Sequence, residues 1–149
     1  KILSKNVAGF ENIRAVHAAL MPSAGGQKIT LADRGTGEWG FTTVQQPLDR
    51  PSATTLEVVE TVDIAQLMAE SGHNRVLILK MDIEGAEIGF LRDAGKWLGR
   101  TGVYLVELHE RIVAGCEQAF HEASRGRFVF RLPGEKYASV SVEDFGEQS

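Results

Sequence analysis

Residues 76–91, VLILKMDIEGAEIGFL, join an apolar strand to a helix through an acidic turn. The apolar run from Val76 to Leu79 predicts a buried β-strand. Carboxylates follow it at Asp82 and Glu84, and the residues from Ala86 onward have the pattern of a helix. In open α/β sheets, ligands bind just beyond the carboxyl ends of the strands. We therefore expect a functional site at this turn.

A second apolar strand, predicted at residues 102–108 (GVYLVEL), ends in similar chemistry. It carries Glu107 near its end, and His109 follows directly. When two neighbouring strands run parallel, their carboxyl ends lie at the same edge of the sheet. These two residues are therefore expected to converge with the two carboxylates of the acidic turn.

The rest of the chain predicts one α/β domain over residues 1–149, with parallel central strands and a closing antiparallel hairpin. The expected strands occupy residues 13–20 (with 15–19 mostly buried), 27–33, 41–44, 56–62, 76–82 and 102–108. The expected helices occupy residues 63–71, 86–94 and 111–124, and the first ten residues resemble the end of another helix. Asp63 is the expected N-cap of the first of these helices, and Gly72 lies near its end. Pro133-Gly134 predicts the turn of a hairpin formed by residues 128–132 and 137–142, whereas 34–40 and 45–55 are expected loops.

Composition excludes several classes of protein. The 149 residues include 16 Lys and Arg against 20 Asp and Glu, with no basic stripe, which argues against a nucleic-acid partner. Cys116 is the one cysteine, so an intrachain disulfide is impossible and a reducing, cytoplasmic setting is expected. Its place on the apolar stripe of a predicted helix indicates a buried thiol. No apolar stretch approaches the ~18–20 residues that span a bilayer, so no membrane partner is expected.

Two motifs in tandem resemble a known family. Residues 80–87 read KMDIEGAE, residues 106–109 read VELH, and residues 61–63 read TVD. In this order they are similar to the FkbM-type S-adenosylmethionine-dependent methyltransferases, whose pattern is K-[IM]-D-[IV]-E-G-x-E followed by V-E-x-H. The resemblance implies a Rossmann-like class I methyltransferase sheet and S-adenosylmethionine as cofactor, and we assign no residue to a metal in this interpretation. It also implies a small-molecule acceptor, a hydroxyl of a sugar or another natural product.

The family's Gly-rich cofactor-binding turn and the acidic residue that follows it are not found in this sequence. The resemblance therefore covers the C-terminal two-thirds of such a domain. In the related fold, two further strands lie between the strand expected at 13–20 and the strand expected at 76–82. We accordingly expect a segment upstream of Lys1, and we expect residues 1–149 alone to bind S-adenosylmethionine weakly.

Methyl transfer to an alcohol requires alignment of donor and acceptor and removal of the hydroxyl proton. Asp82 and Glu84 can face the sulfonium and the acceptor, which makes Asp82 the candidate cofactor contact as well. His109 suits a general base near neutral pH, and Glu107 can orient it or contact the acceptor. Each residue also has a structural interpretation, because Asp82 can cap the next helix and His109 can bond a carbonyl. The two interpretations of Glu84 are evenly balanced.

Two neighbours of this cluster, Glu87 and Lys80, also have structural interpretations. Glu87 lies at a helix N-terminus, where negative charge is stabilised by ~0.3–1 kcal/mol, and this is its preferred interpretation. Lys80 can pair with one of the carboxylates, and this interpretation is evenly balanced against a direct role at the site.

Two other functions remain open on the sequence. Asp82, Glu84, Glu107 and His109 can together form an oxygen-rich site that holds Mg²⁺ or Mn²⁺ in a phosphoesterase. A methyltransferase-like fold can also serve as a non-catalytic interaction domain.

Overall fold

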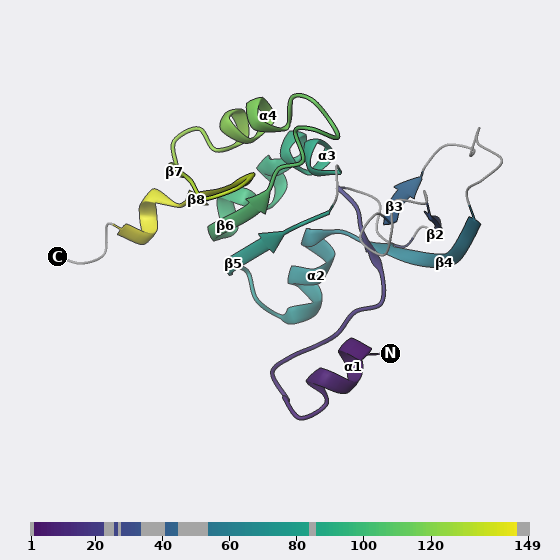
Figure 1. Cartoon of the computed structure of the whole chain (residues 1–149). Helices are drawn as coiled ribbons and strands as arrows, with labels where there is room; N and C mark the ends of the chain where they lie inside the picture. The colour runs from purple at the N-terminus through teal and green to yellow at the C-terminus, as the bar shows by residue number, and fades with distance from the viewer. Residues whose placement is uncertain are drawn as a thin grey trace.

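A computed structural model describes residues 2–22, 26, 28–33, 41–44, 54–83 and 86–145 (Figure 1). The described residues form a mixed α/β structure with two four-stranded sheets. The first sheet has the order β1-β4-β2-β3, with β1 at Ala19–Leu20, β2 at Lys28–Asp33, β3 at Phe41–Val44 and β4 at Thr54–Val62. The second has the order β5-β6-β8-β7, with β5 at Val76–Met81, β6 at Thr101–Glu107, β7 at Phe128–Arg131 and β8 at Lys136–Val140.

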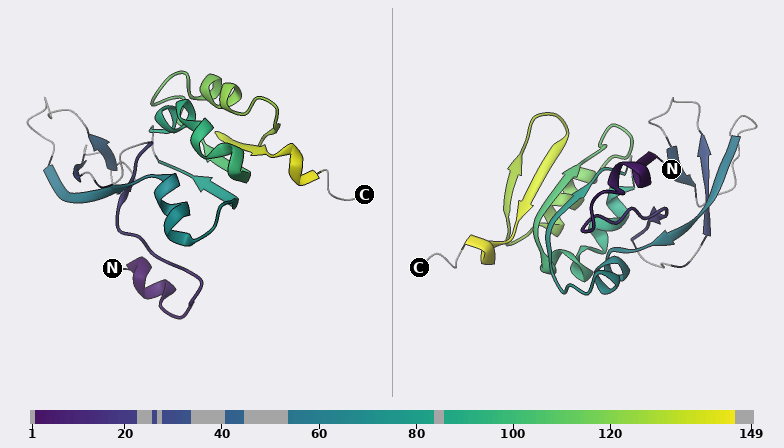
Figure 2. Two further views of the ribbon diagram at one scale, coloured as in Figure 1. Left: turned by 180° about the vertical axis from the view of Figure 1, so that it is seen from behind. Right: turned by 90° about the horizontal axis from the view of Figure 1, so that it is seen from below.

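Among the described residues, four α-helices and three short 3₁₀ turns accompany these strands. The helices are α1 (Ile2–Val7), α2 (Ile64–Ser71), α3 (Glu87–Arg92) and α4 (Cys116–Ala123). The 3₁₀ turns are η1 (Ala94–Lys96), η2 (Leu98–Arg100) and η3 (Val142–Phe145). The hairpin of β7 and β8 lies at one end of the molecule, and β2 and β3 lie at the other (Figure 2). No helix among these described elements is long and apolar enough to cross a membrane.

The second sheet confirms the expected parallel pairing of the two apolar strands, but β5, which was expected to be buried, lies at the edge of the described sheet with Leu77 and Ile78 exposed. β5 and β6 are parallel neighbours, with Met81 opposite Val106. β8 runs antiparallel to β6, and β7 runs antiparallel to β8. The hairpin turn contains Pro133-Gly134 as expected, and Gly134 takes a φ of 79°, a left-handed conformation that glycine adopts without strain.

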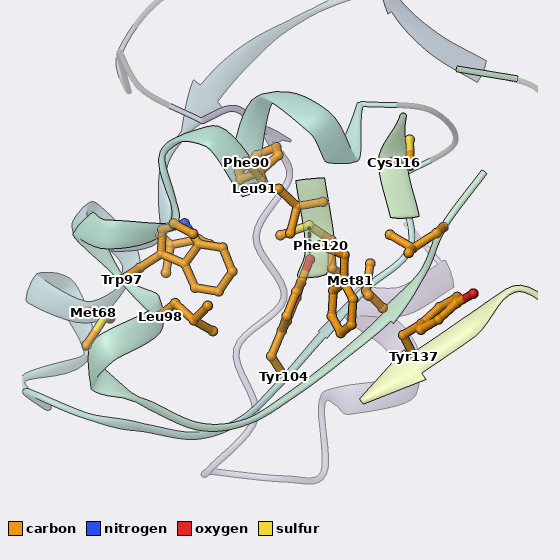
Figure 3. Packing of buried hydrophobic residues seen from close by; sticks show 14 residues of the cluster. Met68, Met81, Phe90, Leu91, Trp97, Leu98, Tyr104, Cys116, Phe120 and Tyr137 are labelled. Carbon is orange, nitrogen blue, oxygen red and sulfur yellow. Dashed lines mark hydrogen bonds between the residues drawn. The ribbon is translucent and has the colours of Figure 1, made fainter. Parts of the chain in front are cut away.

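The hydrophobic core lies between this sheet and helices α3 and α4 (Figure 3). Tyr104 of β6 is fully buried at the centre of this core. Its ring centroid lies 5.0 Å from that of Trp97, which meets it edge-on, and 6.2 Å from that of Phe120. Phe90 of α3 and Met81 of β5 complete the centre. Aromatic side chains of this size bury ~150–250 Å² each, so these rings dominate the burial that holds the helices on the sheet.

Helix α2 begins and ends where the sequence predicted. The Asp63 carboxylate accepts a hydrogen bond of 2.7 Å from the backbone amide of Gln66, as an N-cap does. Gly72 closes the helix in a left-handed conformation with a φ of 73°. Ile64 and Met68 then turn inward and extend the core of the second sheet.

The strand expected at residues 13–20 is mostly wrong. Only Ala19 and Leu20 pair with another strand, β4, and residues 13–18 are irregular. Ile13 and Val16 are exposed. The alanines of this stretch offer little apolar surface, and a strand is stable only where its backbone finds a partner.

The helix expected at residues 111–124 starts later, at Cys116. Gly115 has a φ of 95°, which interrupts a right-handed helix. The Glu110 carboxylate accepts hydrogen bonds from the backbone amides of Gly115 at 2.6 Å and Glu117 at 2.9 Å. Glu110 thereby fixes residues 110–115 as a folded loop and binds the first amides of α4.

Other helices and strands begin or end one residue or more away from their expected bounds. The helix expected at 86–94 ends at Arg92 and continues as η1. β4 is longer than expected, because it begins at Thr54 inside the predicted 45–55 loop. The expected loops at 34–40 and 45–53 lie outside the described residues, as do Glu84 and Gly85.

Candidate active site

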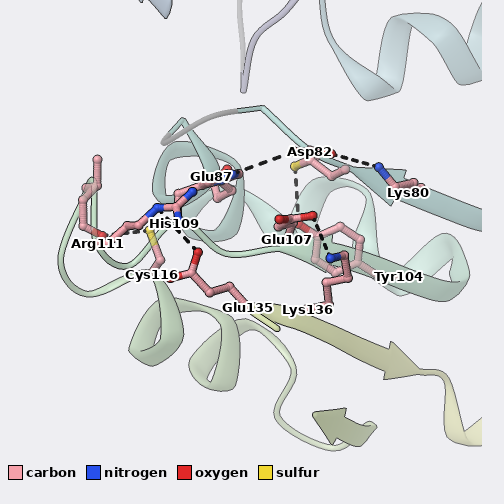
Figure 4. Close-up of polar contacts among 12 residues, drawn as sticks. Lys80, Asp82, Glu87, Tyr104, Glu107, His109, Arg111, Cys116, Glu135 and Lys136 are labelled. Carbon is pink, nitrogen blue, oxygen red and sulfur yellow. Dashed lines mark hydrogen bonds and ion pairs between the residues drawn. The ribbon is translucent and has the colours of Figure 1, made fainter. Parts of the chain in front are cut away.

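The carboxyl ends of β5 and β6 form one edge of the second sheet. Because Met81 pairs with Val106, Asp82 and His109 leave the two strands at the same edge (Figure 4). Glu87 reaches this edge from the first residue of α3. Three elements thus bring an imidazole and two carboxylates together.

The imidazole of His109 has a carboxylate beside each ring nitrogen. Its Nδ1 lies 2.7 Å from Oε1 of Glu87, and its Nε2 lies 3.9 Å from Oδ1 of Asp82. His109 and Glu87 are 1% and 0% exposed, whereas the Asp82 side chain is 38% exposed. The ring therefore connects a carboxylate in the core to one that reaches solvent.

The backbone of His109 is also held by hydrogen bonds. Its carbonyl accepts hydrogen bonds from the amides of Ile112 at 2.8 Å and Val113 at 2.9 Å. The next residue, Glu110, binds the start of α4 through its carboxylate. The position of the imidazole is thus fixed from both the side chain and the main chain.

Asp82 also forms an exposed ion pair with Lys80, whose Nζ lies 3.1 Å from Oδ2. This confirms the expectation that Lys80 pairs with one of the carboxylates of the turn. Since the other oxygen of Asp82 faces His109, the carboxylate is shared between a lysine at the surface and the buried ring.

Comparison with known proteins assigns the chain to a family. The model of the methyltransferase FkbM domain matches residues 19–127, which is more than half of the chain. This chain belongs to the FkbM methyltransferase domain family. The match extends from β1 to the residue before β7 and includes Asp82, Glu87 and His109. No curated protein and no solved structure matched the chain.

Within this FkbM domain, Glu87 is the residue that the sequence interpretation undervalued. It does open α3, as expected, but its carboxylate is fully buried and contacts His109. A charge placed only for the helix dipole can stay exposed, where it gains ~0.3–1 kcal/mol, and has no need to be buried. The available signal was the second glutamate of the motif KMDIEGAE, which lies on the helix face that also carries Leu91 and Phe90 toward the core.

Glu107 is placed differently from the other predicted site residues of the FkbM domain. Its carboxylate pairs with Nζ of Lys136 on β8 at 3.3 Å, and it faces away from the side of the sheet that buries Val106. Residues two apart on a strand share a face, but β6 ends at Glu107, so His109 lies beyond the strand and does not follow its alternation. Among the described residues, Glu87 and Asp82 supply carboxylates beside the ring, and the supporting role of Glu107 stays a prediction, as does any role of Glu84.

A small cavity lies beside Glu107 on that opposite face. Its volume is about 120 Å³, and its lining includes Lys80, Leu105, Leu132 and Lys136. Sites for small molecules usually occupy ~300–1,000 Å³. This cavity alone is therefore too small to hold a sugar-sized acceptor.

Two weakly acidic groups near Glu87, the Tyr104 hydroxyl and the Cys116 thiol, stay protonated. Burial raises the pKa of the Tyr104 hydroxyl, and the negative charge of Glu87 raises it further. That hydroxyl donates to Sδ of Met81 at 3.3 Å. Burial raises the pKa of the Cys116 thiol to about 11, with additional contributions from the charges of Glu87 and Glu110. Cys116 is a buried free thiol, as expected from its position on the helix.

The arrangement does not favour the metal-dependent hydrolase considered on the sequence. Among the residues that the structure describes, no group of three or more His, Cys, Asp or Glu side chains is arranged to hold a metal ion. Of the four ligands considered, Glu84 lies outside those residues, and Glu107 pairs with Lys136. No observation supports that function over methyl transfer.

Proposed function

We propose that this protein is an S-adenosylmethionine-dependent O-methyltransferase that acts on a hydroxyl group of a sugar or another small natural product. Membership of the FkbM methyltransferase family supports the reaction class. The observation that carries the choice of an oxygen acceptor is the imidazole of His109 between Glu87 and Asp82. An alcohol must lose its proton during the reaction, and this ring is positioned to accept one.

The fold forms part of the same proposal. The order β5-β6-β8-β7, with a parallel pair followed by an antiparallel hairpin, supports a Rossmann-like sheet of the class I methyltransferase type. In such sheets the ligand site lies beyond the carboxyl ends of the strands. Asp82 and His109 occupy that edge.

The chemistry of the described site fits a cationic donor at one position. When bound, S-adenosylmethionine supplies an electrophilic methyl group on a positively charged sulfur. Asp82 is the residue that would hold that charge, since it is a partly exposed carboxylate at the strand edge. Near a protein surface, opposite unit charges ~4 Å apart attract by about 4 kcal/mol.

His109 serves as the general base in this proposal. Nε2 of His109 and Oδ1 of Asp82 are 3.9 Å apart, so one hydroxyl oxygen can lie within ~2.8 Å of both atoms. The hydroxyl proton then passes to Nε2, and the carboxylates of Glu87 and Asp82 flank the resulting imidazolium. General base catalysis of this kind contributes about 10²–10⁴-fold to a rate.

The proposed cellular compartment and partners rest on the cysteine and on the net charge. A free, buried thiol at Cys116 suits a reducing compartment such as the cytoplasm. The proposed partner is a small molecule, and the net charge of −4 supports neither nucleic acid nor an anionic membrane as partner.

Methyl transfer from isotopically labelled S-adenosylmethionine to a panel of sugars and phenolic or aliphatic alcohols tests the proposal on the intact protein. We expect labelled product from at least one alcohol and a loss of about 10²–10⁴-fold in turnover for His109→Ala. His121→Ala is the matched control, because His121 is an exposed histidine of α4 that contacts the ring of Phe120. Wild-type turnover in His109→Ala, or no binding of S-adenosylmethionine by calorimetry, contradicts the proposal.

A further inference from the structure

We infer that Lys80 is an exchangeable counter-ion of Asp82, which neutralises this carboxylate when no other cation is bound and yields it to the sulfonium of S-adenosylmethionine. Lys80 is then a specificity-determining residue, because it sets how strongly the site prefers the charged donor over the neutral product. The inference rests on the proposed function, in which Asp82 holds the sulfonium. Neither that proposal nor the family match assigns Lys80 a role in binding.

Both carboxylate oxygens of Asp82 already have a nitrogen beside them. Oδ2 lies 3.1 Å from Nζ of Lys80, near the long end of the hydrogen-bond range. Oδ1 lies 3.9 Å from Nε2 of His109. A further cation that approaches Asp82 must therefore share the carboxylate with these two nitrogens or displace one of them.

The burial of these two partners decides which of them can yield. The His109 side chain is 2% exposed, and its backbone carbonyl accepts two amide hydrogen bonds, so the ring cannot readily withdraw. The Lys80 side chain is 65% exposed, and its pair with Asp82 is open to water. Exposed ion pairs contribute little to stability, because water screens them and replaces the contact that is lost. Lys80 is therefore the partner that can leave Asp82 at a small free-energy cost.

The position of Lys80 in the fold allows this exchange without a change of backbone. Lys80 lies in β5, and Asp82 follows directly after the strand, so the two side chains meet at the strand edge (Figure 4). Lysine carries a compact charge on a flexible four-carbon chain. Its ammonium can move from the carboxylate into solvent by side-chain rotation alone.

The charge of the ligand at sulfur determines whether Lys80 is displaced. S-adenosylmethionine has a positive sulfonium, whereas S-adenosylhomocysteine, which remains after methyl transfer, has a neutral thioether at the same position. The two compounds differ only by the methyl group and its charge. The cation competes with Lys80 for Asp82, and the thioether does not. Lys80 therefore weakens binding of the donor and leaves binding of the product nearly unchanged, which lowers the ratio of the two affinities.

A structural role for Lys80 is the alternative that the test must separate. In that case its ammonium holds the Asp82 carboxylate in the orientation that receives the sulfonium. Loss of the ammonium would then weaken binding of the donor. The two roles predict opposite signs for the same substitution, so the direction of the change distinguishes them.

The experiment measures the affinities of the intact protein for S-adenosylmethionine and for S-adenosylhomocysteine by calorimetry at low salt. In Lys80→Met we expect the donor-to-product affinity ratio to rise by about 1.5–5-fold, the range that corresponds to an exposed ion pair. The rise should shrink at high salt. Lys80→Arg keeps the charge, and we expect it to keep a ratio close to that of the wild type. In an Asp82→Asn background, Lys80→Met should no longer change the ratio, because the shared carboxylate is gone.

Lys136→Met is the matched control. Lys136 also belongs to an exposed ion pair, but its partner is Glu107, 3.3 Å away. The substitution removes the same unit of positive charge from the protein. We expect it to leave the affinity ratio unchanged, which separates competition at Asp82 from a general change of net charge.

The inference is overturned if Lys80→Met lowers the ratio or leaves it unchanged, or if Lys136→Met raises it equally. An undiminished rise in the Asp82→Asn background also overturns it. Failure of the proposed function is a distinct result. In that case the wild-type protein does not bind S-adenosylmethionine, and this inference falls with the proposal.

Discussion

Two ion pairs lie near the end of β6, and they differ in almost every physical respect. Glu87 and His109 form a pair of 2.7 Å with almost no exposed surface. Glu107 and Lys136 form a pair of 3.3 Å, with side chains that are 27% and 50% exposed. Exposed pairs contribute about 0–1 kcal/mol, whereas removing one partner of a buried pair costs about 3–5 kcal/mol.

The contrast between these two ion pairs shows which acidic residue belongs to the site. Glu107 is two residues from His109 in the sequence, and Glu87 is much further away, yet Glu87 contacts the ring. The face of the strand and the depth of burial select the partner. Proximity along the chain does not.

The largest expected effect comes from breaking the buried pair. Glu87→Ala should lower the free energy of unfolding by about 3–5 kcal/mol, because it leaves His109 facing a cavity without its carboxylate. Chemical denaturation monitored by circular dichroism measures this. A double-mutant cycle with His109→Ala should return a coupling well above that of the exposed pair. A loss below about 1 kcal/mol would remove the distinction between the two pairs.

Asp82→Asn sharpens the comparison, because it changes the exposed side of the imidazole and leaves the buried side intact. The variant should fold normally, and its kcat should fall by about 10–100-fold. A hydrogen bond or contact with a charged group contributes about 1.5–3 kcal/mol to the barrier. Steady-state kinetics on any alcohol that the wild type methylates gives the value. Unchanged kcat would show that Asp82 serves only to pair with Lys80.

The reactivity of the Cys116 thiol tests how deeply the surroundings of Glu87 are buried. Burial raises the pKa of this thiol to about 11, so the thiolate fraction at pH 8 should be on the order of 100-fold lower than in an unfolded chain. Alkylation of the native protein at pH 8 should be slower by at least that factor than in denaturant. Because the folded state favours the protonated thiol, this stabilisation is complete below about pH 9 and is lost as the pH rises through about 11. Rapid native alkylation at pH 8 would contradict the buried environment.

The smallest effect is expected for the exposed pair. Lys136→Met should change the free energy of unfolding by less than about 1 kcal/mol, since the ion pair is screened by solvent. Thermal unfolding at low and high salt measures it, and the difference between wild type and variant should shrink at high salt. A loss comparable to that of Glu87→Ala would mean that exposure does not set the strength of these pairs.

The sequence predicted the parts of this fold that depend on local patterns. β5, β6 and the hairpin around Gly134 follow from apolar runs and a turn dipeptide, and the cap at Asp63 follows from its side chain and position. The pairing of β5 with β6, and with it the approach of Asp82 to His109, follows from the order of the elements.

The parts that failed depend on tertiary contacts. Residues 13–18 have a strand-like pattern, but only the two residues that meet β4 are paired. The start of α4 depends on Glu110 reaching forward to two backbone amides. The contact between Glu87 and His109 joins residues that no local pattern connects.

The loop that follows His109 has a consequence for the energetics of each turnover. Hydrogen bonds from the amides of Gly115 and Glu117 lower the pKa of Glu110, so its carboxylate stays ionised and keeps this loop closed at neutral pH. The stabilisation is present above the ordinary pKa and is lost as acid protonates the group. The imidazole is therefore immobilised once, when the chain folds, and no reorganisation of the base is needed when an alcohol arrives.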